Sequence, residues 1–231
     1  MKNLFLVSFI VLFTTANYAQ RKVEEQFKTS EGQQINFNFK FASNIKVIQW
    51  DRNEVNVTAS VLLDNGEGNE AFSLKSEEYS GEMNIYSDYG DYFKQRNNIM
   101  LNCGDHKTEI NYVVHVPRNC NLKIKSITGN VFSDNFSGKL VTDLVSGNVE
   151  LKKYEGELSL KTVSGSLDVT MDKAEVDAKT LTGTIYSDLE IDRFNNNFKK
   201  SVSSRVQGIV SNGKQRTKLE TISGNIYMRK E

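Results

Sequence analysis

The chain has 231 residues, of which 29 are basic and 29 are acidic, so its formal net charge at pH 7 is zero. Lys and Arg are scattered without a run of five or six, which disfavours nucleic acid or an anionic membrane surface as a partner. The length suits one large domain or two small ones.

The first 19 residues have the layout of a secretory signal peptide. Lys2 supplies a short basic region, and an apolar run of ten residues follows from Leu4 to Phe13. This run is too short to span a bilayer, and no other stretch is apolar enough to do so. We expect cleavage between Ala19 and Gln20, and a mature protein in the periplasm or at the cell surface. The alternative is a buried N-terminal helix or strand.

Residues 20–116 alternate apolar and polar side chains, as half-buried β-strands do. Turn-rich segments such as "DRNE" and "DNGEGNE" separate the alternating runs. We expect this part to begin or cap the stack predicted for the rest of the chain. The expected strands cover Ile35–Phe41, Asn44–Trp50, Glu54–Leu63, Glu82–Ser87 and Glu109–Val116.

Residues 117–231 contain a nine-residue repeat. A degenerate first unit starts at Pro117, with Cys120 in the place that glycine takes in later units, and Ala174 takes that place in one other unit. A polar insertion at 189–205 interrupts the spacing, and we expect it to form a protruding loop or a bent rung. The predicted corner glycines are Gly129, Gly138, Gly147, Gly156, Gly165, Gly183 and Gly224.

The other positions of the unit indicate which side chains point inward. The second and fourth residues after the glycine are aliphatic or small, so they are expected to point in, and the polar residues between them to point out. Glycine at the corner permits a positive φ or a close approach to the next rung. Two units would make an 18-residue coil, stacked about 4.8 Å from the next. The predicted fold class is therefore all-β: a single-stranded parallel β-helix, or β-solenoid, of nine-residue half-coils with an irregular N-terminal part. A meander of hairpins is the alternative, but hairpin turns rarely keep so constant a spacing.

Three segments have a recognisable pattern: "YVVHVPRNCNLKIKSITGNV", the closing "TISGNIYMRK" and the upstream "NIKVIQWDRNEVNVTA". Together they resemble the bacterial putative-adhesin family. Members of that family are exported β-helix domains of unknown function, so the resemblance implies the fold and the compartment but no catalytic residues. This sequence departs from the family pattern at Cys120, at Ala174 and at the insertion.

One outward column offers a speculative ligand site. Glu150 and Asp168 occupy equivalent positions one coil apart, so their carboxylates are expected to lie within about 5 Å of each other. Such a pair can share a proton or hold a cation. In a stack that follows chain order, Phe132 and Tyr186 are their neighbours and can pack against a sugar ring. The alternative is an ordinary solvated ladder, like the opposite charges Asp134 and Lys152 or Asp143 and Lys161 on neighbouring rungs.

No metal or cofactor site is expected. A calcium-binding β-roll places an acidic residue two positions after its last glycine, where this repeat is aliphatic. Zinc spacing, a Ser-His-Asp order and phosphate-binding loops are also missing from the sequence. Cys103 and Cys120 are a possible disulfide in an exported protein, or else two half-buried thiols. Tyr79, Tyr86, Tyr89 and Tyr92 are a possible aromatic surface, or ordinary strand residues.

These observations favour a non-catalytic, adhesin-like or structural module at the cell envelope that binds an extended glycan or protein. Two alternatives remain open. A polysaccharide-active enzyme would use Glu150 and Asp168, and a self-assembling envelope protein would pair through an open end of the solenoid. The terminal charges "RKE" disfavour the second alternative, because charges at an exposed strand edge discourage pairing.

Overall fold

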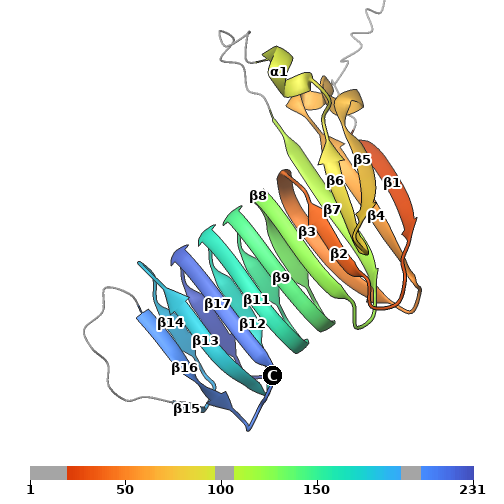
Figure 1. Ribbon diagram of the computed structural model, residues 1–231. Coiled ribbons are helices and arrows are strands. Elements are labelled where there is room, and N and C mark those ends of the chain that lie inside the picture. Colours follow the sequence, from red (N-terminus) through yellow and green to blue (C-terminus); the bar gives the residue numbers. More distant parts are fainter. Residues whose placement is uncertain (1–19, 97–106, 194–203) are drawn as a thin grey trace, which may run out of the picture.

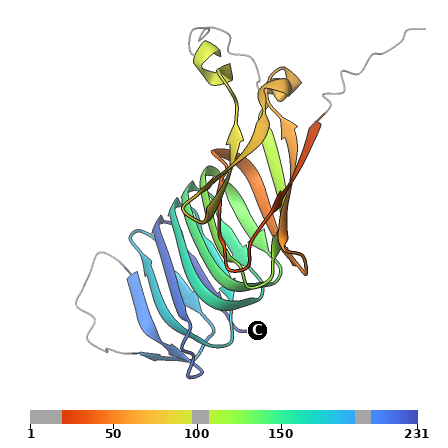
Figure 2. The same ribbon diagram turned by 45° about the vertical axis from the view of Figure 1, so that its right-hand side comes forward.

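The computed structural model describes residues 20–96, 107–193 and 204–231, so the predicted signal peptide and Cys103 lie outside the described residues. Almost every element is a β-strand; the exceptions are two short 3₁₀ turns, Asp64–Gly66 and Asn69–Ala71, and α1 (Tyr92–Arg96). The all-β prediction is confirmed. Figures 1 and 2 show the strands stacked as successive rungs of a solenoid-like body that is widest at its N-terminal end.

The strands form two rows that face each other across the core. The long strand β8 (Asn121–Ser133) turns the corner between the rows, because its first half pairs with β9 and its second half with β10. The first row runs β5 (Ser73–Tyr79), β6 (Glu82–Asp88), β2 (Gln34–Asn38), β8, β9 (Phe136–Ser146), β11 (Tyr154–Ser164), β17 (Arg216–Ser223), β13 (Ala174–Thr180), β16 (Ser204–Val210) and β15 (Ile191–Arg193). The second row runs β1 (Arg21–Lys28), β4 (Glu54–Leu62), β7 (Glu109–Pro117), β3 (Phe41–Trp50), β8, β10 (Val149–Leu151), β12 (Leu167–Thr170), β18 (Ile226–Arg229) and β14 (Ile185–Ser187).

Pairing direction changes along the stack. The rungs from β2 and β3 through β13 and β14 pair in parallel, and within the repeat the partners Leu140 and Leu158 are 18 residues apart. At the N-terminal end, β1, β4 and β7 pair antiparallel, as do β5 and β6. At the other end, β16 pairs antiparallel with both β13 and β15. The segment predicted as an insertion at 189–205 therefore contributes β15 and the first residues of β16 to this end.

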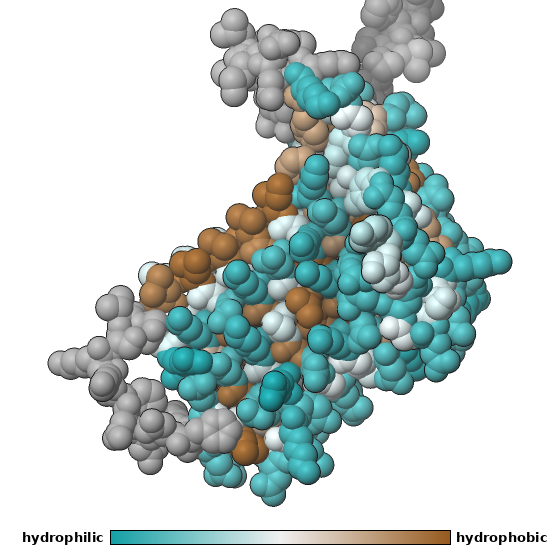
Figure 3. Space-filling model, in the orientation of Figure 1, coloured by the Kyte–Doolittle hydropathy of each residue, from teal (hydrophilic) through white to brown (hydrophobic). Residues whose placement is uncertain are grey.

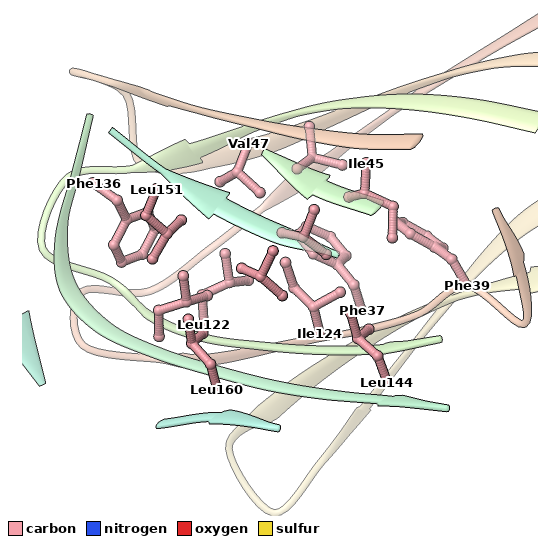
Figure 4. Packing of buried hydrophobic residues seen from close by; sticks show 14 of the residues in the cluster. Phe37, Phe39, Ile45, Val47, Leu122, Ile124, Phe136, Leu144, Leu151 and Leu160 are labelled. Carbon is pink, nitrogen blue, oxygen red and sulfur yellow. The ribbon is translucent and has the colours of Figure 1, made fainter. Parts of the chain in front are cut away.

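One hydrophobic cluster fills the space between the rows. It extends from Ile35 in β2 to Met228 in β18, so the N-terminal strands and the repeat share a single core. Figure 4 shows side chains of both rows meeting there, among them Leu122 and Leu160 from the first row and Val47 and Leu151 from the second. Burial of this apolar surface is the main force that holds the rungs together.

Glycine at the corner is required by the distance between rungs. At Gly156 φ is 133°, and an added Cβ would lie 1.9 Å from the carbonyl oxygen of Gly138 on the next rung. No side chain fits in that space, and side chains rarely adopt such a φ. Gly183 alone among the predicted corner glycines lacks a positive φ. The other six have φ between 116° and 155°: Gly129, Gly138, Gly147, Gly156, Gly165 and Gly224.

The order of the coils in space differs from their order in the chain. Strands β17 and β18 lie between the coil of β11 and β12 and the coil of β13 and β14. The corner glycines follow the same order, because Gly224 packs on Gly165, and Gly183 packs on Gly224. Figure 1 shows β17 between β11 and β13. The C-terminal coil is therefore an internal rung.

The inward positions behave as expected except in the last coil of the second row. The aliphatic residues after the corner are buried from Val131 to Val176, whereas Ile185 is only half-buried and Ser187 is exposed. Ser187 pairs with buried Met228 and so lies on the inward face as expected, but it is exposed because β14 is the end strand of its row and has only β18 as a described partner. Beyond it no further described rung covers this side chain.

Cys120 is a buried thiol, and burial raises its pKa to about 12. An unfolded thiol ionises near pH 8.5. Below that pH both states keep the proton, and above it only the unfolded state loses it. We therefore expect unfolding free energy to fall by up to about 1.4 kcal/mol per pH unit above pH 8.5.

The measurement is urea unfolding of the Cys103→Ser variant at pH 7.5, 8.5 and 9.5. Cys120→Ala in the same background is the control, and its stability should change less over this interval, below the ordinary tyrosine pKa near 10. Equal pH dependence in both variants would contradict the prediction. In the folded Cys103→Ser variant, Cys120 should also resist alkylation until urea unfolds the chain.

Candidate functional site

The predicted ligand residues lie on one outward column of the second row. Strand pairing sets Phe132 beside Glu150, Glu150 beside Asp168, Asp168 beside Tyr227, and Tyr227 beside Tyr186. The first three thus adjoin as expected. Tyr186 does not adjoin Asp168, because the C-terminal coil lies between them. The register therefore corrects that part of the sequence interpretation.

Asp168 is held by an arginine that the sequence interpretation did not consider. The Arg229 side chain donates from Nε and Nη2 to the two carboxylate oxygens of Asp168, both at 2.7 Å. These bonds and the charge of Asp168 raise the pKa of Arg229. Side chains half or more exposed gain little from such pairs, and Arg229 is 53% exposed. A carboxylate with both oxygens accepting from a guanidinium is poorly placed to exchange protons with a substrate.

Two tyrosine rings stack at the end of the column. The centroids of Tyr186 and Tyr227 are 5.2 Å apart and their planes differ by 8°. Asn225 Nδ2 donates to the Tyr227 hydroxyl at 3.1 Å, and the Arg229 guanidinium carbon lies 5.4 Å from the Tyr227 ring centroid. These contacts fix Tyr227 from two sides. Because Tyr186 is on the end strand β14 and is half exposed, its outer face has no described rung beyond it.

A shallow hollow adjoins the stacked rings. Its volume is about 260 Å³. The hollow combines two aromatic rings, a cation and an acid at one end of a rigid row, which suits a polar ligand with one flat apolar face. It is lined by Tyr186, Ser187, Asp188, Tyr227, Met228 and Arg229.

Of the two opposite-charge pairs predicted on neighbouring rungs, one forms an ion pair and the other does not. Asp134 accepts from Lys152 at 2.9 Å and lies 3.4 Å from Lys46, and hydrogen bonds from these two lysines lower its pKa. Among the described residues, no ion pair within 4.0 Å joins Asp143 to Lys161. Asp134 with Lys152 therefore forms a solvated ladder, whereas Asp143 has no ion-pair partner among the described residues.

The four tyrosines considered as a surface do not form one. Tyr89 is buried and its ring contacts Phe41 and Phe72, whereas Tyr79 is 80% exposed. Within the described parts of the chain, no group of three or more His, Cys, Asp or Glu side chains is placed to hold a metal ion.

Comparison with known proteins agrees with this architecture. Residues 115–229 match the model of the family described as Toastrack DUF4097. The chain contains a Toastrack domain. This confirms the resemblance to the putative-adhesin family of unknown function. No curated protein matches the chain.

A solved structure shows the same fold at low sequence identity. A putative cell adhesion protein from Clostridium sporogenes superposes with a TM-score of 0.59 at 10% identity, covering 92% of this chain and all of the other. A putative adhesin from Bacteroides fragilis has a TM-score of 0.29 at 10% identity, with coverages of 91% and 97%. The first similarity establishes the fold only. The second superposition is too poor to support a conclusion about the fold. In the described residues, no helix combines the length and apolarity needed to cross a membrane.

The sequence interpretation missed one surface of the Toastrack domain. Every second corner carries an exposed aliphatic side chain two residues before its glycine, and strand pairing places these side chains on successive rungs. We call this surface the apolar ridge. It consists, in spatial order, of Ile127, Val145, Val163, Ile222 and Leu181, which are 39–52% exposed. The equivalent residues of the alternate corners, Phe136 and Tyr154, are buried, so the pattern appears only when alternate units are compared.

Proposed function

We propose that this protein is a non-catalytic, adhesin-like module of the cell envelope that binds an extended ligand, with a glycan as the first candidate. The observation that carries the proposal is the stacked pair Tyr186 and Tyr227, with the outer face of Tyr186 open and Arg229 fixed beside it. Ring faces of this kind offer apolar area at low entropic cost, and the neighbouring charges orient hydroxyl groups.

The mechanism is repetitive display on a rigid stack. Coils built from two nine-residue units would hold equivalent side chains in columns about 4.8 Å apart. Such a column presents the same spacing over several rungs, so an extended polymer can contact it at more than one point. The predicted export to the periplasm or the cell surface would place that face where envelope polymers are present.

The test is a pull-down with the chain from Gln20 to Glu231. The panel contains peptidoglycan, capsule and outer-membrane fractions and soluble plant and host glycans. We expect retention on at least one glycan, and at least about tenfold weaker retention after Tyr186→Ala with Tyr227→Ala, as for loss of aromatic anchors. Tyr79→Ala removes an exposed tyrosine elsewhere and should bind as the wild type does.

The same tubes test the enzyme alternative. Reducing ends are assayed after incubation, and we expect none above the blank. New reducing ends that disappear in the Glu150→Gln, Asp168→Asn variant would overturn the non-catalytic proposal. If the two tyrosine substitutions leave retention unchanged, the binding face lies elsewhere on the molecule. Retention on protein fractions alone would make the ligand a protein.

A further inference from the structure

The apolar ridge is an exposed hydrophobic strip along one edge of the stack. Its side chains follow one another along a single edge of the stack, which Figure 3 shows as a continuous brown line. Scattered surface aliphatic residues are normal, but a contiguous row marks an interaction surface. On the next rung toward the N-terminal end, exposed Lys40 takes the equivalent position, because Ile127 N donates to Lys40 O and Phe41 pairs with Thr128.

The spacing of the ridge favours an identical partner. Its side chains repeat with the strand spacing of about 4.8 Å, and a second copy repeats with the same spacing, so each aliphatic side chain within an overlap can meet one across the interface. Branched side chains at a constant spacing interdigitate well. A flat or irregular surface would match only some of them.

A column of alternating charge flanks the ridge. It lies two residues earlier on the same strands, so it faces outward beside the ridge. Strand pairing gives the spatial order Lys125, Asp143, Lys161, Glu220 and Lys179. Within this column no ion pair of 4.0 Å or less is described, and only Glu220 has a partner outside it, Lys218 at 3.2 Å. On the other side of the ridge every residue is an exposed Thr or Ser: Thr128, Ser146, Ser164, Ser223 and Thr182.

This charge pattern is complementary to itself in one orientation. A two-fold axis that runs two ridges antiparallel sets the charged column of one copy against that of the other. With the ridges overlapping over Val145 to Leu181, Asp143 faces Lys179 of the second copy and Lys161 faces Glu220. This overlap also keeps Lys40 out of the contact. Each copy makes both contacts twice, once from each side of the axis.

We propose that the apolar ridge is the contact through which two copies of this chain associate, antiparallel and with this offset. The contact is small. Four rungs and three columns measure roughly 14 by 10 Å between side-chain centres, which leaves the buried area at or below about 1,000 Å², the low end of specific interfaces. The association is therefore weak and reversible, and it leaves the Tyr186 face on a different row.

Sedimentation equilibrium tests the association. We expect the chain from Gln20 to Glu231, which contains every described element, to shift from monomer to dimer between about 1 and 200 µM, the range of a weak interface. Val145→Asp should weaken dimerisation at least about tenfold, because it buries an unpaired charge at the contact. Tyr79→Asp, which removes an exposed tyrosine outside the ridge, should leave it unchanged. Circular dichroism confirms that both variants are folded.

Charge reversal tests the orientation. Asp143→Lys alone should weaken the dimer, and adding Lys179→Asp should restore it, because these residues face each other only between copies. A monomer at every concentration, a dimer that Val145→Asp leaves intact, or a double variant without restored association would each overturn the proposal. A chain that stays monomeric can also be tested for co-sedimentation with phosphatidylcholine vesicles. If it co-sediments and Val145→Asp abolishes this binding, the ridge binds a lipid surface instead. None of these outcomes affects glycan retention by Tyr186 and Tyr227.

Discussion

Gly156→Ala is expected to lower the unfolding free energy by about 3–5 kcal/mol, from a strained φ and an overpacked contact combined. The added methyl would lie 1.9 Å from the Gly138 carbonyl oxygen and 2.8 Å from its carbonyl carbon. Both are backbone atoms of the neighbouring rung, so the clash is relieved only if the two rungs separate. Urea unfolding followed by circular dichroism gives the free energy.

Gly81→Ala separates the two contributions. Gly81 has a φ of 79° in the turn between β5 and β6, with nothing within 4 Å of an added Cβ. This variant keeps the backbone strain without the clash, so it should lose only about 1–2 kcal/mol. Similar losses in the two variants would mean that the corners do not need glycine for close approach.

Phe39→Ala is expected to destabilise the whole chain by about 3–5 kcal/mol, the usual cost of removing a buried aromatic ring. Phe39 is fully buried and its ring stacks on Tyr112 at 4.0 Å and on Phe37 at 5.2 Å. Its backbone nitrogen also donates to Lys125 of β8, so it lies where the N-terminal strands meet the repeat. Because the N-terminal strands and the repeat share one hydrophobic cluster, the loss of stability should affect both parts.

Two probes measure whether unfolding stays cooperative. Trp50 is the only tryptophan, so tryptophan fluorescence reports on β3, whereas far-ultraviolet circular dichroism reports on all strands. We expect the two urea transitions to coincide in the wild type and to move together in Phe39→Ala. Tyr79→Ala, at an 80% exposed site, should change stability by less than about 0.5 kcal/mol. A Trp50 transition that precedes the main circular dichroism change would show two separate folding units.

The sequence predicts what is local to one rung. Alternation of apolar side chains gave five of the seven strands of residues 20–116; for example, the expected Glu54–Leu63 is observed as Glu54–Leu62. It missed β1 and β5, and the expected Ile35–Phe41 runs past the end of β2 at Asn38. The corner glycines and inward aliphatic residues were predictable for the same reason, because the pleat and the corner of a rung depend only on its own residues. The family resemblance added the solenoid-like fold.

The order of the rungs was not predictable from the repeat. The coils at residues 174–187 and 216–229 both carry a corner glycine followed by inward apolar or small residues, so the repeat pattern alone does not say which of them packs on β11 and β12. The choice between them depends on how residues 189–215 connect the two coils, and periodicity says nothing about that. The misplacement of Tyr186 beside Asp168 follows directly from this ambiguity.

The same ambiguity hid the partner of Asp168. The terminal charges were interpreted as protecting an exposed edge, but β18 pairs with both β12 and β14. Arg229 therefore sits on an internal strand, and its guanidinium reaches Asp168 on the neighbouring rung. The argument from strand-edge charge consequently does not apply to this end of the chain.

The internal position of the C-terminal coil has a consequence for the order of folding. In a stack built in chain order, each rung can dock on the rung that precedes it in the chain. Here β13 pairs with β17 and β16 but not with β11, so it joins the main stack only after the coil of β17 and β18 has docked. Docking of that coil is therefore the step that completes the stack. A variant without residues 216–231 would lose the rung that joins the two parts of the stack, which is a far greater loss than a frayed end.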